Sequence, residues 1–305
     1  MDKKRLVVID GNALIHRAFH ALPSLTSPKG KLVNAVYGFL LVFLKALKEL
    51  QPDYIAATFD LAGPTFRDKL YKEYKAKRVK APDELYEQIP EVKEILKAFE
   101  VPIFEKQGFE ADDVIGTIAK LAKRQQISPE IETIIITGDL DALRLVDKNT
   151  KVYTLKRGLK ETILYDKNLV VERYDGLKPE QLTDFRALRG DPSDNIPGVP
   201  GIGEKTAIQL LKEFGTLENL YEKIRNSRFE IRDSLKAKLL ENKEMAFFSK
   251  KLAAINLNVP IDFNLEKCFH QKLNRQKVIK AFEQLGFHSL IKRLNEGEQA
   301  KLGNF

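Results

Sequence analysis

Hydrophobic positions in the first half of the chain fall into two alternating patterns, short continuous apolar runs and longer stretches with helical spacing. The runs "RLVVID", "YIAATFD" and "ETIIITGD" end at Asp10, Asp60 and Asp139, and "VPIFE" is a shorter candidate. Apolar residues recur every three or four positions over residues 35–50, 84–100 and 109–123. Buried runs that alternate with amphipathic helices are typical of an α/β domain whose largely parallel sheet is covered by helices.

The second half of the chain shows a different pattern. The segment "KVYTLKRGLKETILYD" predicts a hairpin at a sheet edge that turns near Gly158. After about Val170 the strand signals disappear, and helical patterns separated by Gly and Pro follow. We therefore expect an α/β domain over residues 1–170, a helical domain over 171–293 and a C-terminal tail over 294–305.

Composition narrows the class of protein and of partner. Hydrophobic residues at 43% and charged residues at 31% describe a folded globular protein. The longest apolar run, Tyr37 to Leu44, is too short to cross a bilayer and no signal peptide is evident, so we expect a cytoplasmic protein without a membrane partner. The single Cys268 excludes an internal disulfide and a thiolate zinc cluster. A net charge of +8 favours an anionic partner, above all nucleic acid.

Acidic residues follow the predicted strands, where each strand ends. Asp10, Asp60 and Asp139 end three of them, and three further acids open the helix over residues 109–123. The carboxyl ends of parallel strands share one rim, which is where open α/β sheets bind ligands. A single acid there is explained equally well as a helix cap. So many carboxylates together would repel one another unless a cation neutralised them, and Mg²⁺ is the usual remedy.

The stretch "FEADDVIG" raises the question of why a helix with a clean apolar stripe begins with three acids. Glu110 and Asp113 lie one helical turn apart on a predicted shared face, and Asp112 is offset beside them. We predict that this turn contributes ligands to two neighbouring ions.

The segment "RGDPSDNIPGVPGIGEKT" carries two further acids, Asp191 and Asp194, around a Pro-Ser turn, which on its own is an ordinary loop. Its glycines suggest a phosphate-binding loop, but Glu204 stands where that motif requires lysine, so an ATPase is excluded. A Gly-x-Gly turn before a helix either directs backbone N–H groups at a phosphate or is a tight turn between packed helices. Both interpretations remain open.

Aromatic and basic residues alternate in "FRDKLYKEYKAKRVK". If the segment is one helix, a single side of it carries Arg67, Tyr71, Tyr74, Lys75 and Arg78. Such a face suits a single nucleic-acid strand, because bases stack on the rings while phosphates meet the cations. The alternative is a solvated charged helix.

Taken together, these segments resemble a known family. The motifs are "LVVIDGNALIHRAFHALP", "NAVYGFL", "FDLAGPTFRDKLYKEYKAKR", "GFEADDVIGTIA", "TGDLDALRLV" and "RALRGDPSDNIPGVPGIGEKTA". They are similar to those of the bacterial 5′ nucleases, which are related to flap endonucleases and form the N-terminal domain of DNA polymerase I. The resemblance covers nearly the whole chain. It implies a PIN-like α/β domain with a helical arch, followed by an all-α domain with a helix-hairpin-helix variant.

The resemblance also assigns residues. The segment with Lys75 and Arg78 is similar to the helical arch, and these two residues would contact the scissile phosphate and act as catalytic residues together with Tyr74. The implied metal ligands are Asp10, Asp60, Glu110, Asp112, Asp113, Asp139, Asp141, Asp191 and Asp194. The implied DNA-binding residues are Arg67, Tyr71, Gly198, Gly201, Gly203, Lys205 and Thr206. Relatives usually carry Lys where this chain has Leu140, and a larger apolar residue where it has Ala142.

The implied activity is hydrolysis of phosphodiester bonds at 5′ flaps and 5′ ends by a two-metal-ion mechanism, during DNA replication and repair. The cofactors would be two Mg²⁺ ions, with Mn²⁺ able to substitute, and a K⁺ ion at the helix-hairpin-helix. The partner would be DNA with a 5′ single-strand to duplex junction, with or without an RNA primer. The protein would be a monomer, linked covalently or functionally to a DNA polymerase. Two rivals are a non-catalytic, structure-specific DNA-binding protein and a small PIN-type ribonuclease, which would lack the helical domain and the arch.

Overall fold

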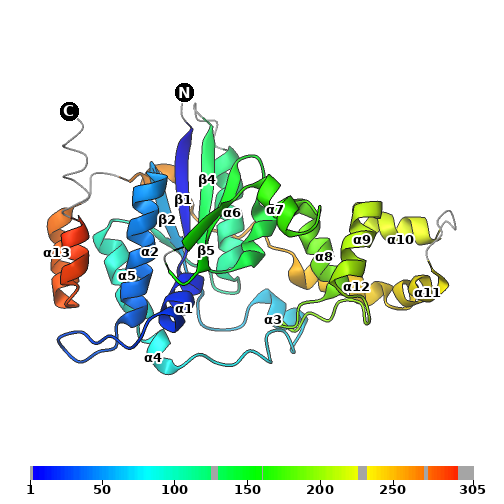
Figure 1. Cartoon of the computed structure of the whole chain (residues 1–305), viewed down its shortest axis with the longest axis horizontal. Coiled ribbons are helices and arrows are strands. Elements are labelled where there is room, and N and C mark those ends of the chain that lie inside the picture. The colour runs from blue at the N-terminus through cyan, green and yellow to red at the C-terminus, as the bar shows by residue number, and fades with distance from the viewer. Residues whose placement is uncertain (1–2, 125–129, 160, 226–231, 271–273, 295–305) are drawn as a thin grey trace.

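A six-stranded sheet forms the centre of the molecule. The computed structural model describes residues 3–124, 130–159, 161–225, 232–270 and 274–294. The strands are β1 (Lys4–Asp10), β2 (Tyr54–Thr58), β3 (Ile103–Phe104), β4 (Ile131–Thr137), β5 (Thr150–Arg157) and β6 (Glu161–Tyr165). Their order is β3-β2-β1-β4-β5-β6, and all neighbours are parallel except β5 and β6 (Figure 1). The predicted parallel sheet and its edge hairpin are therefore confirmed.

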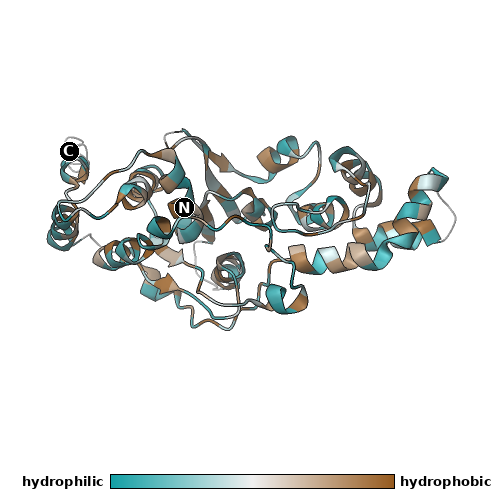
Figure 2. Cartoon of the chain, turned by 90° about the horizontal axis from the view of Figure 1, so that it is seen from below, coloured by the Kyte–Doolittle hydropathy of each residue, from teal (hydrophilic) through white to brown (hydrophobic). Residues whose placement is uncertain are grey.

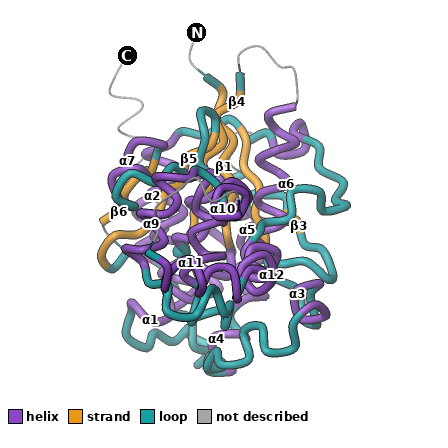
Figure 3. The backbone as a smooth tube through the Cα atoms, turned by 90° about the vertical axis from the view of Figure 1, so that its right-hand side faces the viewer, coloured by secondary structure: helices purple, strands orange, loops and turns teal. Residues whose placement is uncertain are grey.

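Helices cover both faces of this sheet, because alternate residues of the central strands point to opposite sides. Leu6 and Val8 of β1 pack in one apolar cluster with α6 (Ala111–Arg124). Val7 and Ile9 pack in a second cluster with α1 (Gly11–Ala21), α2 (Asn34–Leu50) and α5 (Ile89–Ala98). Figure 3 shows α2 and α6 on opposite sides of the strands. Among the described residues, no helix combines the length and the apolar character needed to cross a bilayer.

The predicted helix over residues 84–100 is divided in two, α4 (Asp83–Tyr86) and α5. Between them the side chain of Gln88 is buried and accepts a hydrogen bond from the N–H of Ala35, at 2.8 Å, at the start of α2. Pro90 in the first turn of α5 suits a helix start, because that position needs no N–H donor. The apolar spacing alone does not reveal this break.

A layer of helices extends from one end of the sheet, on the right of Figure 1. It contains α7 (Lys167–Arg173), α8 (Leu182–Arg189), α9 (Glu204–Phe214), α10 (Leu217–Arg225), α11 (Asp233–Glu241) and α12 (Lys243–Ala253). Hydrophobic and hydrophilic residues alternate around these helices (Figure 2), as expected where one face packs and the other meets water. The predicted change to helical structure after about residue 170 is present.

The predicted single helical domain over residues 171–293 is wrong at its C-terminal end. From Ile255 the chain returns along α6, where the N–H of Val259 donates to Thr117 at 3.0 Å. It then forms α13 (Arg275–Gln284), whose Phe282 packs against Phe99 of α5, at the far end of the sheet from α9 and α10 (Figure 1). An amphipathic helix has the same pattern whichever surface it covers, so periodicity could not place α13. Residues 295–305 of the predicted tail lie outside the described residues.

Candidate active site

Eight of the nine predicted metal ligands line one cavity beyond the carboxyl ends of β1, β2 and β4. The cavity has a volume of about 470 Å³. β1 ends at Asp10 itself, whereas Asp60 and Asp139 each lie two residues beyond the last residue of their strands. The lining acids are Asp10, Asp60, Glu110, Asp112, Asp139, Asp141, Asp191 and Asp194. The structure therefore brings together acids that the sequence places at one rim.

We call Asp10, Asp112 and Asp139 the inner carboxylates. Asp10 accepts hydrogen bonds from the hydroxyl of Thr137 at 2.6 Å and from the N–H of Ala13 at 3.1 Å, and Asp139 accepts one from the N–H of Asp141 at 2.8 Å. Within the described part of the chain, none of the three forms an ion pair. Asp10 and Asp139 are thus held by neutral donors.

Burial raises the pKa values of all three inner carboxylates. Burial, followed by the neighbouring Asp60 and Asp139, raises the pKa of Asp10 to about 7. Burial, followed by Asp10 and Asp139, raises the pKa of Asp112 well above its usual range. The pKa of Asp139 is also raised, by burial first and then by Asp141. Carboxylates that resist ionisation side by side are suited to a divalent cation, which restores the charged form.

Two further acids connect the cavity to the start of α6 and to the basic segment. Asp60 accepts a hydrogen bond from the N–H of Ala111 at 2.7 Å, in the first turn of α6. Glu110 accepts from the ammonium of Lys75 at 2.5 Å and from the hydroxyl of Tyr74 at 3.2 Å. Asp10 and Asp139 are themselves N-caps, of α1 and of the short 3-10 turn after β4, so the capping explanation holds for acids that also line the cavity.

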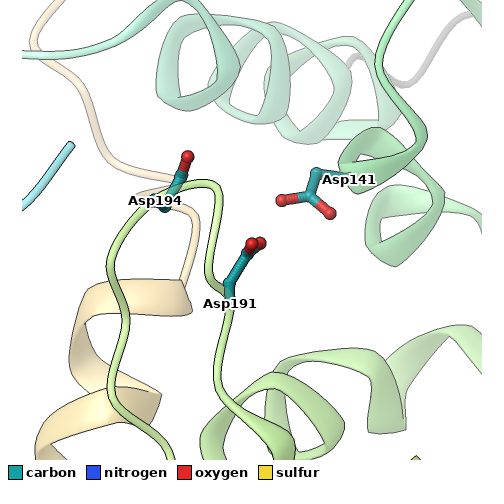
Figure 4. Close-up of side chains that lie close together, drawn as sticks. All are labelled: Asp141, Asp191 and Asp194. Carbon is teal, nitrogen blue, oxygen red and sulfur yellow. The ribbon is translucent and has the colours of Figure 1, made fainter. Parts of the chain in front are cut away.

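We call Asp141, Asp191 and Asp194 the outer carboxylates. Each offers one oxygen, and these oxygens lie within 4.8 Å of one another (Figure 4). Asp191 and Ile196 exchange two backbone hydrogen bonds of 2.9 Å, which close the Asp-rich loop. The loop is thus a rigid holder for two carboxylates.

Cations surround the outer carboxylates, in contrast to the inner ones. Asp141 contacts Arg144 at 2.7 Å and Arg186 at 2.6 Å. Burial acts to raise the pKa of Asp141, but Arg144 and then Arg186 outweigh it and lower the pKa below the usual value. Asp194 accepts a hydrogen bond from Arg78 at 2.5 Å. Asp191 in turn contacts Arg186, so each outer carboxylate is already paired with a guanidinium group.

The ninth acid, Asp113, does not line the cavity, although it does share a face with Glu110: one nitrogen of Arg67 contacts Glu110 at 3.3 Å and Asp113 at 2.7 Å. Its side chain is fully buried, and both oxygens bind the guanidinium of Arg67, at 2.7 and 2.8 Å. The N–H of Asn256 donates to it at 2.7 Å. With its oxygens committed to these donors, Asp113 is a structural residue and not a ligand in this arrangement.

The predicted helix through the basic segment is also wrong. The helix α3 (Phe66–Leu70) ends before Tyr71, and turns follow over residues 72–77. The chain leaves helical geometry because Tyr74 is drawn inward: its side chain is 4% exposed and donates hydrogen bonds to Glu110 and Asp194. Lys75 has a positive φ of 54°, and its N–H donates to the carbonyl of Asp194 at 2.9 Å. We call residues 71–80 the turn segment.

Tertiary contacts thus divide the predicted nucleic-acid face. Arg67 is 3% exposed and lies in the ion pair with Asp113, so it is not on an exposed face; it does line the cavity, and its contact with DNA stays a prediction. Tyr71 packs edge-on against Phe248 of α12, with 5.4 Å between ring centroids, and is half-buried. Lys75, Arg78 and Tyr74 remain at the cavity.

The predicted helix-hairpin-helix corresponds to α8, a glycine-rich loop and α9. Gly198 and Gly201 have positive φ angles of 66° and 76°, and a Cβ on Gly198 would lie 2.3 Å from the backbone nitrogen of Gly190. Gly203 precedes α9, whose first turn carries the exposed Lys205 and the half-buried Thr206. The turn between packed helices is therefore present, and its contact with DNA and a K⁺ ion stay predictions.

Several cavity residues were missed by the sequence argument. Arg144 and Arg186 contact Asp141, and α1 contributes further cavity-lining cations and imidazoles, which are His16, Arg17 and His20. Arg186 is 45 residues away from Asp141 along the chain, so no local spacing marks it, whereas Arg144 follows Asp141 by three residues and could have been noticed. The unusual Leu140 packs in the apolar core and Ala142 is buried, and neither lines the cavity.

Two family models match the chain in succession. Residues 5–175 match the 5′-3′ exonuclease, N-terminal resolvase-like domain, and residues 177–276 match the 5′-3′ exonuclease, C-terminal SAM fold. DNA polymerase I of Bacillus subtilis is 43% identical over 97% of this chain and 33% of its own length. DNA polymerase I of Chloroflexus aurantiacus is 45% identical over 97% of this chain and 31% of its own length. The chain thus spans about a third of these relatives.

Solved structures share the fold at low sequence identity. The D15 protein of phage T5, co-crystallised with metal ions, superposes with a TM-score of 0.67 at 20% identity, covering 92% of this chain and all 100% of that one. The catalytic core of Rad2 in complex with a DNA substrate superposes with a TM-score of 0.59 at 19% identity, covering 93% of this chain and 88% of that one. Since the first family model alone covers more than half of the chain, and the second continues it, the chain belongs to the 5′-3′ exonuclease family.

Proposed function

We propose that this chain is a Mg²⁺-dependent nuclease that hydrolyses phosphodiester bonds at 5′ flaps and 5′ ends, next to a single-strand to duplex junction. The observation that carries the proposal is the cavity, in which eight carboxylates face one another with Lys75 and Arg78 at the same place. Oxygen donors of this kind fit a hard divalent cation, and burial beside other carboxylates raises the pKa values of Asp10 and Asp112, which a cation would lower again. Solved relatives in fold were crystallised with metal ions and with DNA.

The inner carboxylates would hold one ion and the outer carboxylates the second. Such ions activate an attacking water and stabilise the leaving oxygen. The protein's own contribution is to hold the carboxylates in place through Thr137 and the closed Asp-rich loop. Lys75 and Arg78 now rest on Glu110 and Asp194, where they are within reach of a phosphate that enters the cavity. Their charge would offset the charge that grows on that phosphate.

The hairpin between α8 and α9 would bind the duplex through its phosphates. Gly203 and Lys205 are exposed beside the start of α9, where N–H groups and an ammonium can meet a phosphate. Contacts to phosphates fix position and carry little sequence information. Recognition should therefore depend on the shape of the junction.

The biological setting follows from the relatives. DNA polymerase I matches this chain over about a third of its length, so we propose that the nuclease acts beside a polymerase during DNA replication and repair. In that setting it would remove displaced 5′ strands, including RNA primers, and it would act as a monomer.

The test is cleavage of a 5′-labelled flap duplex by the wild type and by Asp112→Asn, with Mg²⁺ and with a chelator. Asparagine keeps the shape but not the charge, so the variant should cut at least about 100-fold more slowly while it still binds the junction. The matched control is Asp262→Asn, which alters an acid that is exposed and far from the cavity. Equal cutting by wild type and Asp112→Asn would refute the site, and binding by the wild type without any cutting would favour the non-catalytic rival.

A further inference from the structure

The inner and outer carboxylates differ in one respect that the two-ion site does not require. The outer carboxylates all contact guanidinium groups: Asp141 contacts Arg144 and Arg186, Asp191 contacts Arg186, and Asp194 contacts Arg78. Of the inner carboxylates, Asp10 and Asp139 instead accept hydrogen bonds from hydroxyl and N–H donors. The ion pairs therefore lie at the outer carboxylates, and among the described residues none of them involves an inner carboxylate.

Arg186 has the central position among these guanidinium groups. It projects from α8, its side chain is 19% exposed, and it bridges Asp141 at 2.6 Å and Asp191 at 3.2 Å. These are two of the three acids whose oxygens lie within 4.8 Å of one another. Arginine does not lose its proton in proteins, so it can release these carboxylates only by moving.

The other two guanidinium groups are placed differently. Arg144 also donates to the carbonyls of Asp141 and Ala253, which fix it to the protein backbone. Arg78 comes from the turn segment and is about half exposed. Within the described part of the chain, only Arg186 contacts two outer carboxylates without a hydrogen bond from its guanidinium to the backbone, so it is the group that an arriving ion would have to displace.

We propose that Arg186 is a positioning residue that occupies the outer carboxylates as an internal cation until substrate is bound. This proposal rests on the proposed function, and it adds the order in which the two ions and the DNA bind. Without DNA, the inner carboxylates take an ion and the outer ones stay paired with Arg186. A bound phosphate offers the guanidinium another anionic partner, because arginine pairs well with phosphate, and the outer carboxylates then become available. Binding of the second ion and binding of DNA consequently favour each other.

The experiment counts Mn²⁺ ions bound to the full chain without DNA, from the electron paramagnetic resonance signal of free Mn²⁺. The wild type should bind one ion and then a second one much more weakly. Arg186→Gln should bind the second ion at least about tenfold more tightly, since a unit charge within about 4 Å of the site is removed. A variant whose fold was damaged would bind Mn²⁺ more weakly. Tighter binding of the second ion would therefore show that Arg186 competes with that ion for the outer carboxylates.

Two control variants separate the effect of Arg186 from a general loss of charge on α8 and from a change of side chain at position 186. Arg189→Gln removes an equal charge from the same helix, where Arg189 pairs with Glu204 at 3.6 Å outside the cavity, and should leave both Mn²⁺ affinities unchanged. Arg186→Lys keeps a positive charge at this position, so its affinity for the second Mn²⁺ ion should stay within about threefold of the wild-type value.

The proposal would be overturned if the wild type bound both Mn²⁺ ions with equal affinity. It would also be overturned if Arg186→Gln bound the second Mn²⁺ ion no more tightly than the wild type. In either case, metal-dependent flap cutting could still stand, so the proposed function would survive. Absence of Mn²⁺ binding in every variant would instead refute the two-ion site and the proposal together.

Discussion

The buried pair of Arg67 and Asp113 shows how a residue that looks functional can be structural. Both side chains are almost fully inaccessible, and each satisfies the other with two short hydrogen bonds. Arg67 also donates to the carbonyls of Leu252 and Ala254. Removing one member of a buried pair leaves the other charge without a partner.

Arg67→Ala should therefore destabilise the protein by about 3–5 kcal/mol. The free energy of unfolding from urea titration measures this loss. Lys69→Ala, on the exposed side of the same short helix, should change it by less than about 0.5 kcal/mol. If Arg67→Ala kept its stability but lost DNA binding, the assignment of Arg67 to the DNA contact would be supported instead.

Asp10 gives a prediction about pH. Its pKa in the folded protein is about 7, against 3.8 for the ordinary side chain, through burial first and then Asp60 and Asp139. As pH rises above about 4, the unfolded chain loses this proton before the folded one does, so folding becomes less favourable up to about pH 7. The metal-free wild type should thus lose stability between pH 5 and pH 8 relative to Asp10→Asn. Melting temperatures at a series of pH values, measured with chelator, test this, and parallel curves for the two proteins would contradict it.

At the scale of elements, the sheet and its acidic rim were predictable from sequence because both depend on local pattern. Strand runs that end in Asp10, Asp60 and Asp139 are enough to place three acids at one rim of a parallel sheet. The turn segment was not predictable, because Tyr74 leaves the helix to reach Glu110 and Asp194, which are 36 and 120 residues away along the chain. Asp113 was misplaced for the same reason, since its partner Arg67 is 46 residues away.

The helix α6 illustrates a conflict between propensity and packing. Gly116 is a poor helix former, yet a Cβ there would lie 2.6 Å from Leu257 and 2.8 Å from Ile255 on the returning chain. Gly116→Ala should therefore destabilise the protein by about 1–2 kcal/mol, because overpacking outweighs the gain in helix propensity. Urea unfolding measures the difference, and a variant as stable as the wild type would show that the returning segment yields easily.

At the scale of the whole molecule, the charge of +8 coexists with a cavity lined by eight acids. The positive charge must therefore act elsewhere, and we expect it to act on DNA phosphates. Affinity for a flap duplex should fall steeply with added salt and vary little with sequence.

Lys205→Ala should weaken this affinity for all sequences alike and reduce the slope of log affinity against log salt by about 1. Fluorescence anisotropy with a labelled flap duplex measures both. The control is Lys277→Ala on α13, at the opposite end of the molecule, which should leave the slope unchanged (Figure 1). An equal change in both variants would mean that the hairpin has no special part in binding.

The segment from Leu252 to Asn256 ties the helical layer to the cavity wall, since it closes the bonds around Arg67 and Asp113. Because this segment comes late in the sequence, it is synthesised after the residues that it contacts. The ribosome releases every cavity acid, from Asp10 to Asp194, before it releases this segment. A nascent chain thus contains all of its cavity carboxylates while Arg67 and Asp113 still lack these backbone partners, and we expect the cavity wall to form only when residues 252–256 have emerged and docked.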